Sequence, residues 1–94
     1  MKIFIEFTGV AREFTGTGEM EVEVPAGSTY RDLVRLLADL FPGLVGVLID
    51  PNRESFLSSN MFVINGDLAF PAMIMDESPV DGERIALMSV ITGG

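Results

Sequence analysis

The residues with the clearest chemical potential are the last two, Gly93 and Gly94, which follow a strand-like run over residues 84–90. Glycine has no Cβ, so a Gly-Gly tail is thin and flexible enough to enter a narrow channel. This tail indicates that the reacting group is the terminal carboxylate of Gly94. The alternative is an ordinary frayed end, because chain termini are often disordered.

The chain contains neither Cys nor His, which excludes several kinds of site. Disulfides, cysteine-ligated zinc, iron–sulfur clusters and a His-dependent triad are all excluded. The carboxylates are spread along the chain without the spacing of a metal-binding loop. A stand-alone enzyme is therefore the least favoured class, although a carboxylate site assembled only by folding stays open. We expect no metal and no bound cofactor.

The charge balance restricts the partners. The chain has 14 acidic and 6 basic residues, a net charge of −8, and its bases form no run. Such a field repels nucleic acid. No apolar run reaches the ~18 residues of a membrane helix, and Glu6 comes too early for a signal-peptide core. We expect a soluble cytoplasmic protein without nucleic-acid or membrane partners, with one domain over residues 1–94 and a flexible tail at 92–94.

Two alternating patterns predict the first strands. Residues 2–8 alternate and are rich in β-branched and aromatic side chains. In residues 19–24, Met20, Val22 and Val24 share one face and three glutamates share the other, which is typical of a half-buried strand. Residues 9–18 contain three glycines and are expected to form the loop of a long hairpin.

One main helix is predicted over residues 30–41. Thr29 and Asp32 have the spacing of a capping box, and Pro42 stops the helix. Leucines at positions 33, 36, 37 and 40 recur at helical spacing, so this stripe is expected to lie in the core. The apolar residues 44–49 fit either a short helical turn or an extended segment packed under the sheet.

The rest of the chain predicts three more strands. Residues 84–90 are apolar on both faces apart from Ser89, which predicts a central strand that is buried on both faces. We place this strand parallel to the first one. The remaining expectations are a surface loop at 50–60, strands at 61–64 and 68–70 around a turn at 65–67, and an irregular crossover at 73–79. This order predicts an α+β fold of the β-grasp type, with a mixed four- to five-stranded sheet packed on one main helix.

Several segments, in this order, resemble the ubiquitin-like sulfur carriers, and above all the small subunit of molybdopterin synthase. The tail is the most specific of them. The segments are residues 7–16, residues 24–29 followed by Leu33, residues 62–66, residues 81–87 and residues 90–94. The chain departs from the family at residues 44–60, which are longer than a minimal member needs, and at 88–91, which lack the prolines often found there.

The resemblance implies a specific chemistry for the tail. A ubiquitin-activating-like adenylyltransferase would use ATP to adenylate the Gly94 carboxylate, and a sulfur donor would convert it to a thiocarboxylate. The tail would then enter the large subunit of molybdopterin synthase and deliver sulfur to a pterin precursor. Gly93 and Gly94 would be the catalytic residues, and the chain would be the sulfur-carrying subunit without a complete active site of its own.

A carrier must also dock on its partners. The apolar content exceeds what a small sheet needs inside, so we expect some of these residues at the surface. Met88 and Ile91 are the leading candidates, because the tail leaves the sheet there, and Arg12 could pair with an acid of the partner. The further candidates are Thr92, Phe7 and Phe62. Core packing is the alternative for the apolar residues, and a plain surface charge is the alternative for Arg12.

Other functions use the same features. Sulfur could instead pass to thiamine, to an amino acid or to tRNA. A ubiquitin-like modifier would pass its activated tail to a lysine, and Lys2 is the only lysine of this chain. A β-grasp interaction module would not need its tail at all. The sequence does not distinguish molybdenum from tungsten use.

Overall fold

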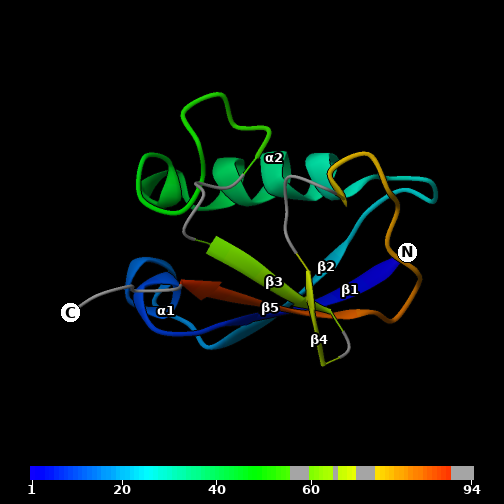
Figure 1. Ribbon diagram of the computed structural model, residues 1–94, viewed down its shortest axis with the longest axis horizontal. Coiled ribbons are helices and arrows are strands. Elements are labelled where there is room, and N and C mark those ends of the chain that lie inside the picture. The colour runs from blue at the N-terminus through cyan, green and yellow to red at the C-terminus, as the bar shows by residue number, and fades with distance from the viewer. Residues whose placement is uncertain (56–59, 65, 70–73, 90–94) are drawn as a thin grey trace.

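The computed structural model describes residues 1–55, 60–64, 66–69 and 74–89 (Figure 1). Their helices and strands follow the predicted order, with one addition near the N-terminus. The elements are β1 (Lys2–Phe7), α1 (Val10–Thr15), β2 (Glu19–Glu23), α2 (Tyr30–Leu40), the 3-10 helix η1 (Pro42–Leu44), β3 (Asn60–Ile64), β4 (Asp67–Ala69) and β5 (Arg84–Ser89).

The strands form one mixed sheet in the order β2-β1-β5-β3-β4. β1 is antiparallel to β2 and parallel to β5, while β3 is antiparallel to both β5 and β4. The main helix α2 lies across one face of this sheet (Figure 1). The predicted β-grasp, with the first and last strands parallel at its centre, is therefore confirmed.

The alternation of the first two strands sets their faces. Ile3 and Ile5 of β1 are buried, and Ile3 lies opposite the buried Val22 of β2. The glutamates of β2 are exposed on the other face. Because α2 covers only one face, every second residue of these strands meets the helix and the others meet solvent.

The capping box predicted for α2 is present. The Thr29 hydroxyl accepts a hydrogen bond from the Asp32 N–H at 3.2 Å, and the Asp32 carboxylate accepts one from the Thr29 N–H at 3.0 Å. The bond from the Thr29 backbone is the main reason that the pKa of Asp32 is held below its ordinary value. The cap thus fixes where the helix begins.

The leucine stripe of α2 is only partly core, contrary to the prediction. Leu33 and Leu37 are buried, but Leu36 is half-buried and Leu40 is 47% exposed. The buried face is centred on residues 30, 34 and 37 rather than on the leucines alone. With about 100° between successive residues, positions 36 and 40 lie at the flank of that face.

The predicted loop at residues 9–18 contains a helix, α1, and the prediction was wrong there. Gly9 and Gly16 flank the helix with φ values of 52° and 73°, and the Gly16 N–H donates to the Arg12 carbonyl at 2.9 Å. A left-handed residue at the end of a helix favours glycine. The glycines that suggested a loop therefore mark the two ends of a short helix, which buries Ala11.

The prediction that β5 is buried on both faces also needs correction. Ile85 and Leu87 are buried, whereas Arg84 is exposed and Ala86 is half-buried. The Arg84 guanidinium lies 5.1 Å from the centre of the Phe4 ring on the neighbouring strand. β5 is central in the order of strands, but only one of its faces is covered by α2.

The ambiguous segment 44–49 closes one end of the core. Leu44, Leu48 and Ile49 are buried, and the Leu48 and Ile49 N–H groups both donate to the Leu44 carbonyl. The segment is thus a compact turn after η1, packed into the core beside the sheet. Within the described residues, no helix has the length and apolar character needed to cross a membrane.

A buried polar contact holds the other end of the core. The Tyr30 hydroxyl donates to the Glu83 carboxylate at 2.5 Å, and both side chains are buried. Burial first, and then the bond to Glu83 and its negative charge, raise the pKa of Tyr30 well above its ordinary value. The Tyr30 N–H also donates to the Glu77 carbonyl at 2.9 Å. These contacts fasten the crossover before β5 to the start of α2.

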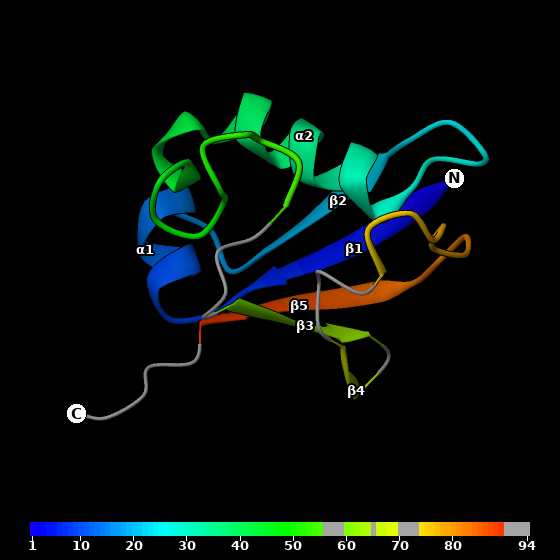
Figure 2. The ribbon, with the colours of Figure 1, turned by 45° about the horizontal axis from the view of Figure 1, so that its top comes forward.

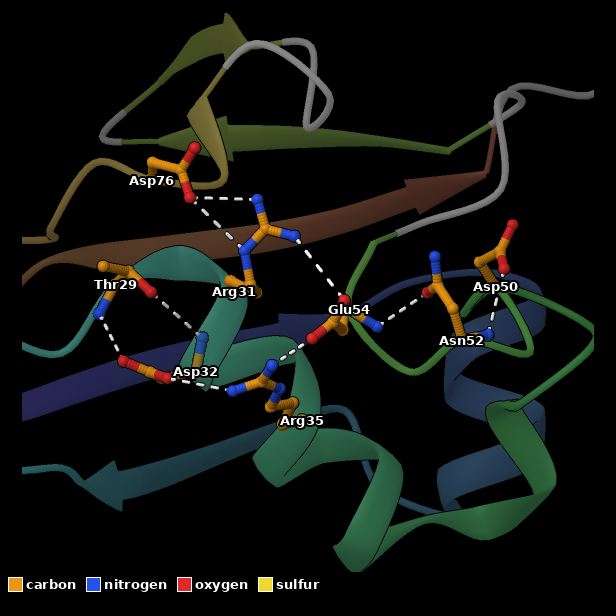
Figure 3. Close-up of polar contacts among 8 residues, drawn as sticks. All are labelled: Thr29, Arg31, Asp32, Arg35, Asp50, Asn52, Glu54 and Asp76. Carbon is orange, nitrogen blue, oxygen red and sulfur yellow. Dashed lines mark hydrogen bonds and ion pairs between the residues drawn. The ribbon is translucent and has the colours of Figure 1, made fainter.

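Arginines on the outer side of α2 tie two further segments to the helix (Figure 3). Arg31 pairs with Asp76 at 2.9 Å and with Glu54 at 3.9 Å, and Arg35 also pairs with Glu54. Asn52 orients Glu54 by accepting a hydrogen bond from its N–H at 2.8 Å. These pairs lie at the surface, where each is expected to contribute little to stability.

Candidate functional site

The predicted reacting group belongs to the last residues of the chain. Gly93 and Gly94, with Ile91 and Thr92, lie outside the described residues. β5 is described as far as Ser89. The candidate site that the structure does describe is therefore the body surface around the carboxyl end of β5, from which the tail continues.

A side-chain hydrogen bond fastens this end of β5 to β1. The two strands run parallel with Phe7 opposite Leu87, and the Thr8 hydroxyl donates to the Leu87 carbonyl at 2.8 Å. The bond lies two residues before the last described residue of β5. The point where the tail begins is thus held against the end of a central strand.

Helix α1 stands beside this point. It contacts β1, β5 and η1, and both ribbon views place α1 near the carboxyl end of β5 (Figures 1 and 2). The Thr15 hydroxyl donates to the carbonyls of Ala11 and Thr17 at 2.9 and 3.0 Å. These bonds stabilise the end of the helix locally, and the buried Ala11 packs the helix against the body.

Three large apolar side chains are exposed on these segments. Phe14 of α1 is 48% exposed, Leu40 at the end of α2 is 47% exposed, and Val47 after η1 is 37% exposed. The Phe14 ring lies over the backbone of Gly43, where an added methyl group would come within 3.6 Å of its Cδ1. We call Thr8, Arg12, Phe14, Leu40 and Val47 the exit surface. The 3-10 helix η1 contacts both α1 and α2, so these three exposed apolar side chains lie on neighbouring segments.

The exit surface contains one of the predicted docking residues, Arg12. This side chain is exposed on α1, and its guanidinium lies against Gly18, where an added methyl group would come within 3.6 Å of Cζ. Arg12 is thus positioned by α1 and turned toward the start of β2. Its pairing with an acid of a partner stays a prediction.

The assignment of Phe7 to a docking surface needs correction. Its side chain is 2% exposed and packs edge-on against Phe41, with the ring centres 5.5 Å apart. The reason is the alternation of β1, because Phe7 shares the covered face with Ile3 and Ile5. Phe7 therefore belongs to the core and is not available for direct contact with a partner.

The other two candidates are placed by their backbone alone. Phe62 of β3 lies opposite Leu87, and Met88 lies opposite Met61. The side chains of Phe62 and Met88 lie outside the described part of the molecule. The sequence reasoning did not identify Phe14, Leu40 and Val47 as candidates. These residues are related through helix α1, which the sequence reasoning did not predict.

The described residues contain no group of three Asp or Glu side chains that could hold a metal ion. The buried Tyr30–Glu83 pair lies before the start of β5, at the opposite end from the exit surface. The buried pair is therefore separate from the exit surface.

Comparison with known proteins agrees with this fold and extends it. SAMP1 of Haloferax volcanii, a small archaeal modifier protein, matches over 100% of both chains with a TM-score of 0.83 and 19% identity. A putative molybdopterin converting factor subunit 1 from Pyrococcus furiosus matches over 96% of this chain and 98% of its own, with a TM-score of 0.74 and 19% identity.

A further match is a chain in the complex of subunits 1 and 2 of the molybdopterin-converting factor from Helicobacter pylori. The match has a TM-score of 0.61 and 17% identity, and it covers 100% of this chain and 100% of that chain. At these identities the structures establish a shared ubiquitin-like fold. The family is established by sequence, because the ThiS family model matches residues 5–94. The chain belongs to the ThiS family, the ubiquitin-like sulfur carriers that its segments resemble.

Proposed function

We propose that this chain carries sulfur on the carboxylate of Gly94 and serves as the small subunit of a molybdopterin synthase, in the cytoplasm. The observation that carries the proposal is the family match over residues 5–94, which includes Gly93 and Gly94. The exit surface supports it, because α1, which carries the exposed Phe14, contacts β5, the strand that continues toward that tail.

The carboxylate needs activation, because its negative charge repels nucleophiles. A ubiquitin-activating-like adenylyltransferase would join the Gly94 carboxylate to AMP and release pyrophosphate from ATP. A sulfur donor would then displace AMP and leave a thiocarboxylate. Gly93 and Gly94 add no side chain to the tail, so it can thread a narrow pocket. ATP is consumed by the partner enzyme in this scheme, and the carrier itself holds no cofactor.

The body would dock while the tail reacts. Phe14, Leu40 and Val47 offer apolar area next to the end of β5, and Arg12 adds a positive charge at the rim. The partner proposed for this surface is the large subunit of molybdopterin synthase. The Helicobacter pylori complex of subunits 1 and 2 supports this choice, since its fold matches the whole of this chain.

A second candidate function is a ubiquitin-like modifier, favoured by the likeness to SAMP1. The two functions share activation and differ in the acceptor, which is sulfur in one and a lysine amine in the other. Sulfur transfer to thiamine, an amino acid or tRNA is a third possibility within the carrier class. The molybdopterin branch is preferred because the ordered segments of the chain resemble that subunit. A putative molybdopterin converting factor subunit 1 and a complex of subunits 1 and 2 among the matched structures support this choice.

The test is a reconstitution with the untagged protein. The chain is incubated with the activating enzyme, ATP and sulfide, and then with the large subunit and the precursor pterin. The proposal expects sulfur in the pterin product and loss of that product when Gly94 is deleted. A conjugate on lysine, formed while the pterin stays free of sulfur, would favour the modifier.

A C-terminal tag separates both functions from a plain interaction module. A tag after Gly94 blocks the carboxylate and is expected to abolish charging, whereas the same tag before Met1 should leave it intact. An interaction module would tolerate either tag. Partner binding that survives the C-terminal tag with no charging at any stage of the assay would favour that module.

A further inference from the structure

The free edge of the sheet carries a second feature, independent of the tail. β2 is the outermost strand on one side, and among the described residues it pairs with β1 alone. Figure 2 shows β2 beside β1, on the side away from β5. An outer strand presents backbone N–H and C=O groups to which another chain can add.

The hydrogen-bond pattern shows which residues face outward. Met1 and Val24 exchange two backbone bonds of 2.9 Å, and the Phe7 N–H donates to the Gly18 carbonyl at 3.0 Å. Bonded pairs alternate along an antiparallel ladder, so Val22 and Met20 also bond toward β1. The backbone groups of the glutamates between them therefore point to the free edge.

The free part of this edge is short. At one end the Thr17 hydroxyl donates to the Glu19 carbonyl at 3.0 Å. At the other end Pro25 has no N–H to offer. Between them, the N–H and C=O groups of Glu21 and Glu23 have no hydrogen-bond partner among the residues that the structure describes. The edge thus leaves four backbone groups open at two alternate residues.

The side chains select the charge of an added strand. Glu21 and Glu23 are exposed on the open face of the sheet, and residues opposite each other in paired strands share a face. Glu21 lies 3.8 Å from Lys2, with both side chains about half exposed, so this pair is weak. A second copy of β2 is a poor occupant, because it would bring glutamates against glutamates.

We propose that the β2 edge binds an extended basic segment of a partner protein. The segment adds as a further strand beside Glu21 and Glu23 and places Lys or Arg at alternate positions over the open face. In the strand register Glu23 lies opposite Lys2, at the start of β1. The exit surface lies at the other end of β1 and β5. Binding at this edge therefore leaves the tail free to react.

The test uses a capped peptide, Val-Lys-Val-Lys-Val, and amide hydrogen exchange followed by NMR. The peptide is expected to slow exchange of the Glu21 and Glu23 amides and to leave those of Met20 and Val22, which already bond to β1, unchanged. A peptide N-methylated at its three inner residues keeps the charges but cannot pair as a strand, so it should give no protection. Equal binding by this peptide would overturn the proposal.

Charge is tested on the protein. The double variant Glu21→Lys with Glu23→Lys should bind the peptide with an affinity lower by about tenfold or more, since two attractive cross-strand pairs become repulsive. The control is Glu13→Lys with Glu77→Lys, which changes the net charge equally at exposed positions elsewhere. An equal loss of affinity in the two double variants would show an effect of net charge alone. No peptide binding by the unchanged protein would show that the glutamates only protect the edge from pairing. Either result overturns the proposal.

Discussion

The two ends of the β1–β5 pair are built in different ways. Where β5 begins, hydrogen bonds to carboxylates dominate: the buried Tyr30 hydroxyl donates to Glu83, and the Thr29 N–H donates to the exposed Asp32. Where β5 ends, Phe14, Leu40 and Val47 are exposed, and the first turn of α1 has no side-chain cap. Polar contacts fix the body at one end, while apolar side chains are exposed at the other end, where we propose that a partner docks. The following changes test that difference.

Deletion of Gly94 should have the largest effect. Without the terminal residue the activating enzyme finds no correctly placed carboxylate, so ATP–pyrophosphate exchange should fall to background. The melting temperature should stay unchanged, because the described core ends with β5 at Ser89. Exchange at the full rate by the shortened chain would contradict the assignment of the tail.

Tyr30→Phe should destabilise the fold without affecting charging. The substitution leaves the buried Glu83 carboxylate without its hydroxyl donor, and such a loss costs ~1–3 kcal/mol in the free energy of unfolding. Urea unfolding measures the cost. A loss of charging at a temperature where the variant is fully folded would argue against separate roles for the two ends.

The same residue predicts a pH dependence. The pKa of Tyr30 is raised in the folded state, so its contribution is complete below the ordinary pKa of ~10 and is lost as pH rises further. The unfolding free energy should therefore fall above about pH 10, by up to ~1.4 kcal/mol per pH unit. Tyr30→Phe should lack this fall. Tyr30 is the only tyrosine, so tyrosinate absorbance reports it directly, and its appearance at an ordinary pKa in the native protein would refute the buried contact.

Phe14→Ala should weaken docking with little change in stability. A half-exposed ring contributes little to the core, but its loss from an interface centre costs ~1–2 kcal/mol, or roughly tenfold in affinity. Calorimetric titration with the large subunit measures this. The matched control is Val80→Ala, a 61% exposed residue in the crossover before β5. Equal losses for both variants would mean that the exit surface has no special role.

Arg35→Ala should have the smallest effect. Arg35 pairs with Glu54 and Asp32 on the outer side of α2 (Figure 3), where exposed ion pairs contribute ~0–1 kcal/mol. Urea unfolding at low and high salt measures the difference. A loss of unfolding free energy well above that of Tyr30→Phe would show that the surface ion pairs, and not the buried Tyr30–Glu83 contact, stabilise the end of the body where β5 begins.

Local patterns explain which parts of the fold were predictable. The alternation of β1 and β2 and the cap of α2 are properties of neighbouring residues, so sequence reasoning placed them correctly. The same alternation assigns Phe7 to the face of Ile3 and Ile5, a signal that its earlier assignment to a docking surface overlooked. Helix α1 escaped prediction because six residues with one buried side chain, Ala11, show no period.

The candidate site was only half predictable for a physical reason. The Gly-Gly tail is a covalent feature and is visible in the sequence. The exit surface depends on contacts between α1 and η1, whose residues Phe14 and Gly43 are far apart along the chain. Exposure of a single apolar residue has no local signature, so Leu40 looked like the rest of its helical stripe until the buried face of α2 was known.

The most direct test of the central claim is the mass of the charged protein, followed by fragmentation of its C-terminal peptide. After incubation with the activating enzyme, ATP and sulfide, the account predicts a gain matching one oxygen replaced by one sulfur, located at Gly94. An unchanged mass with an enzyme proven active on another carrier, or sulfur located elsewhere in the chain, would contradict it.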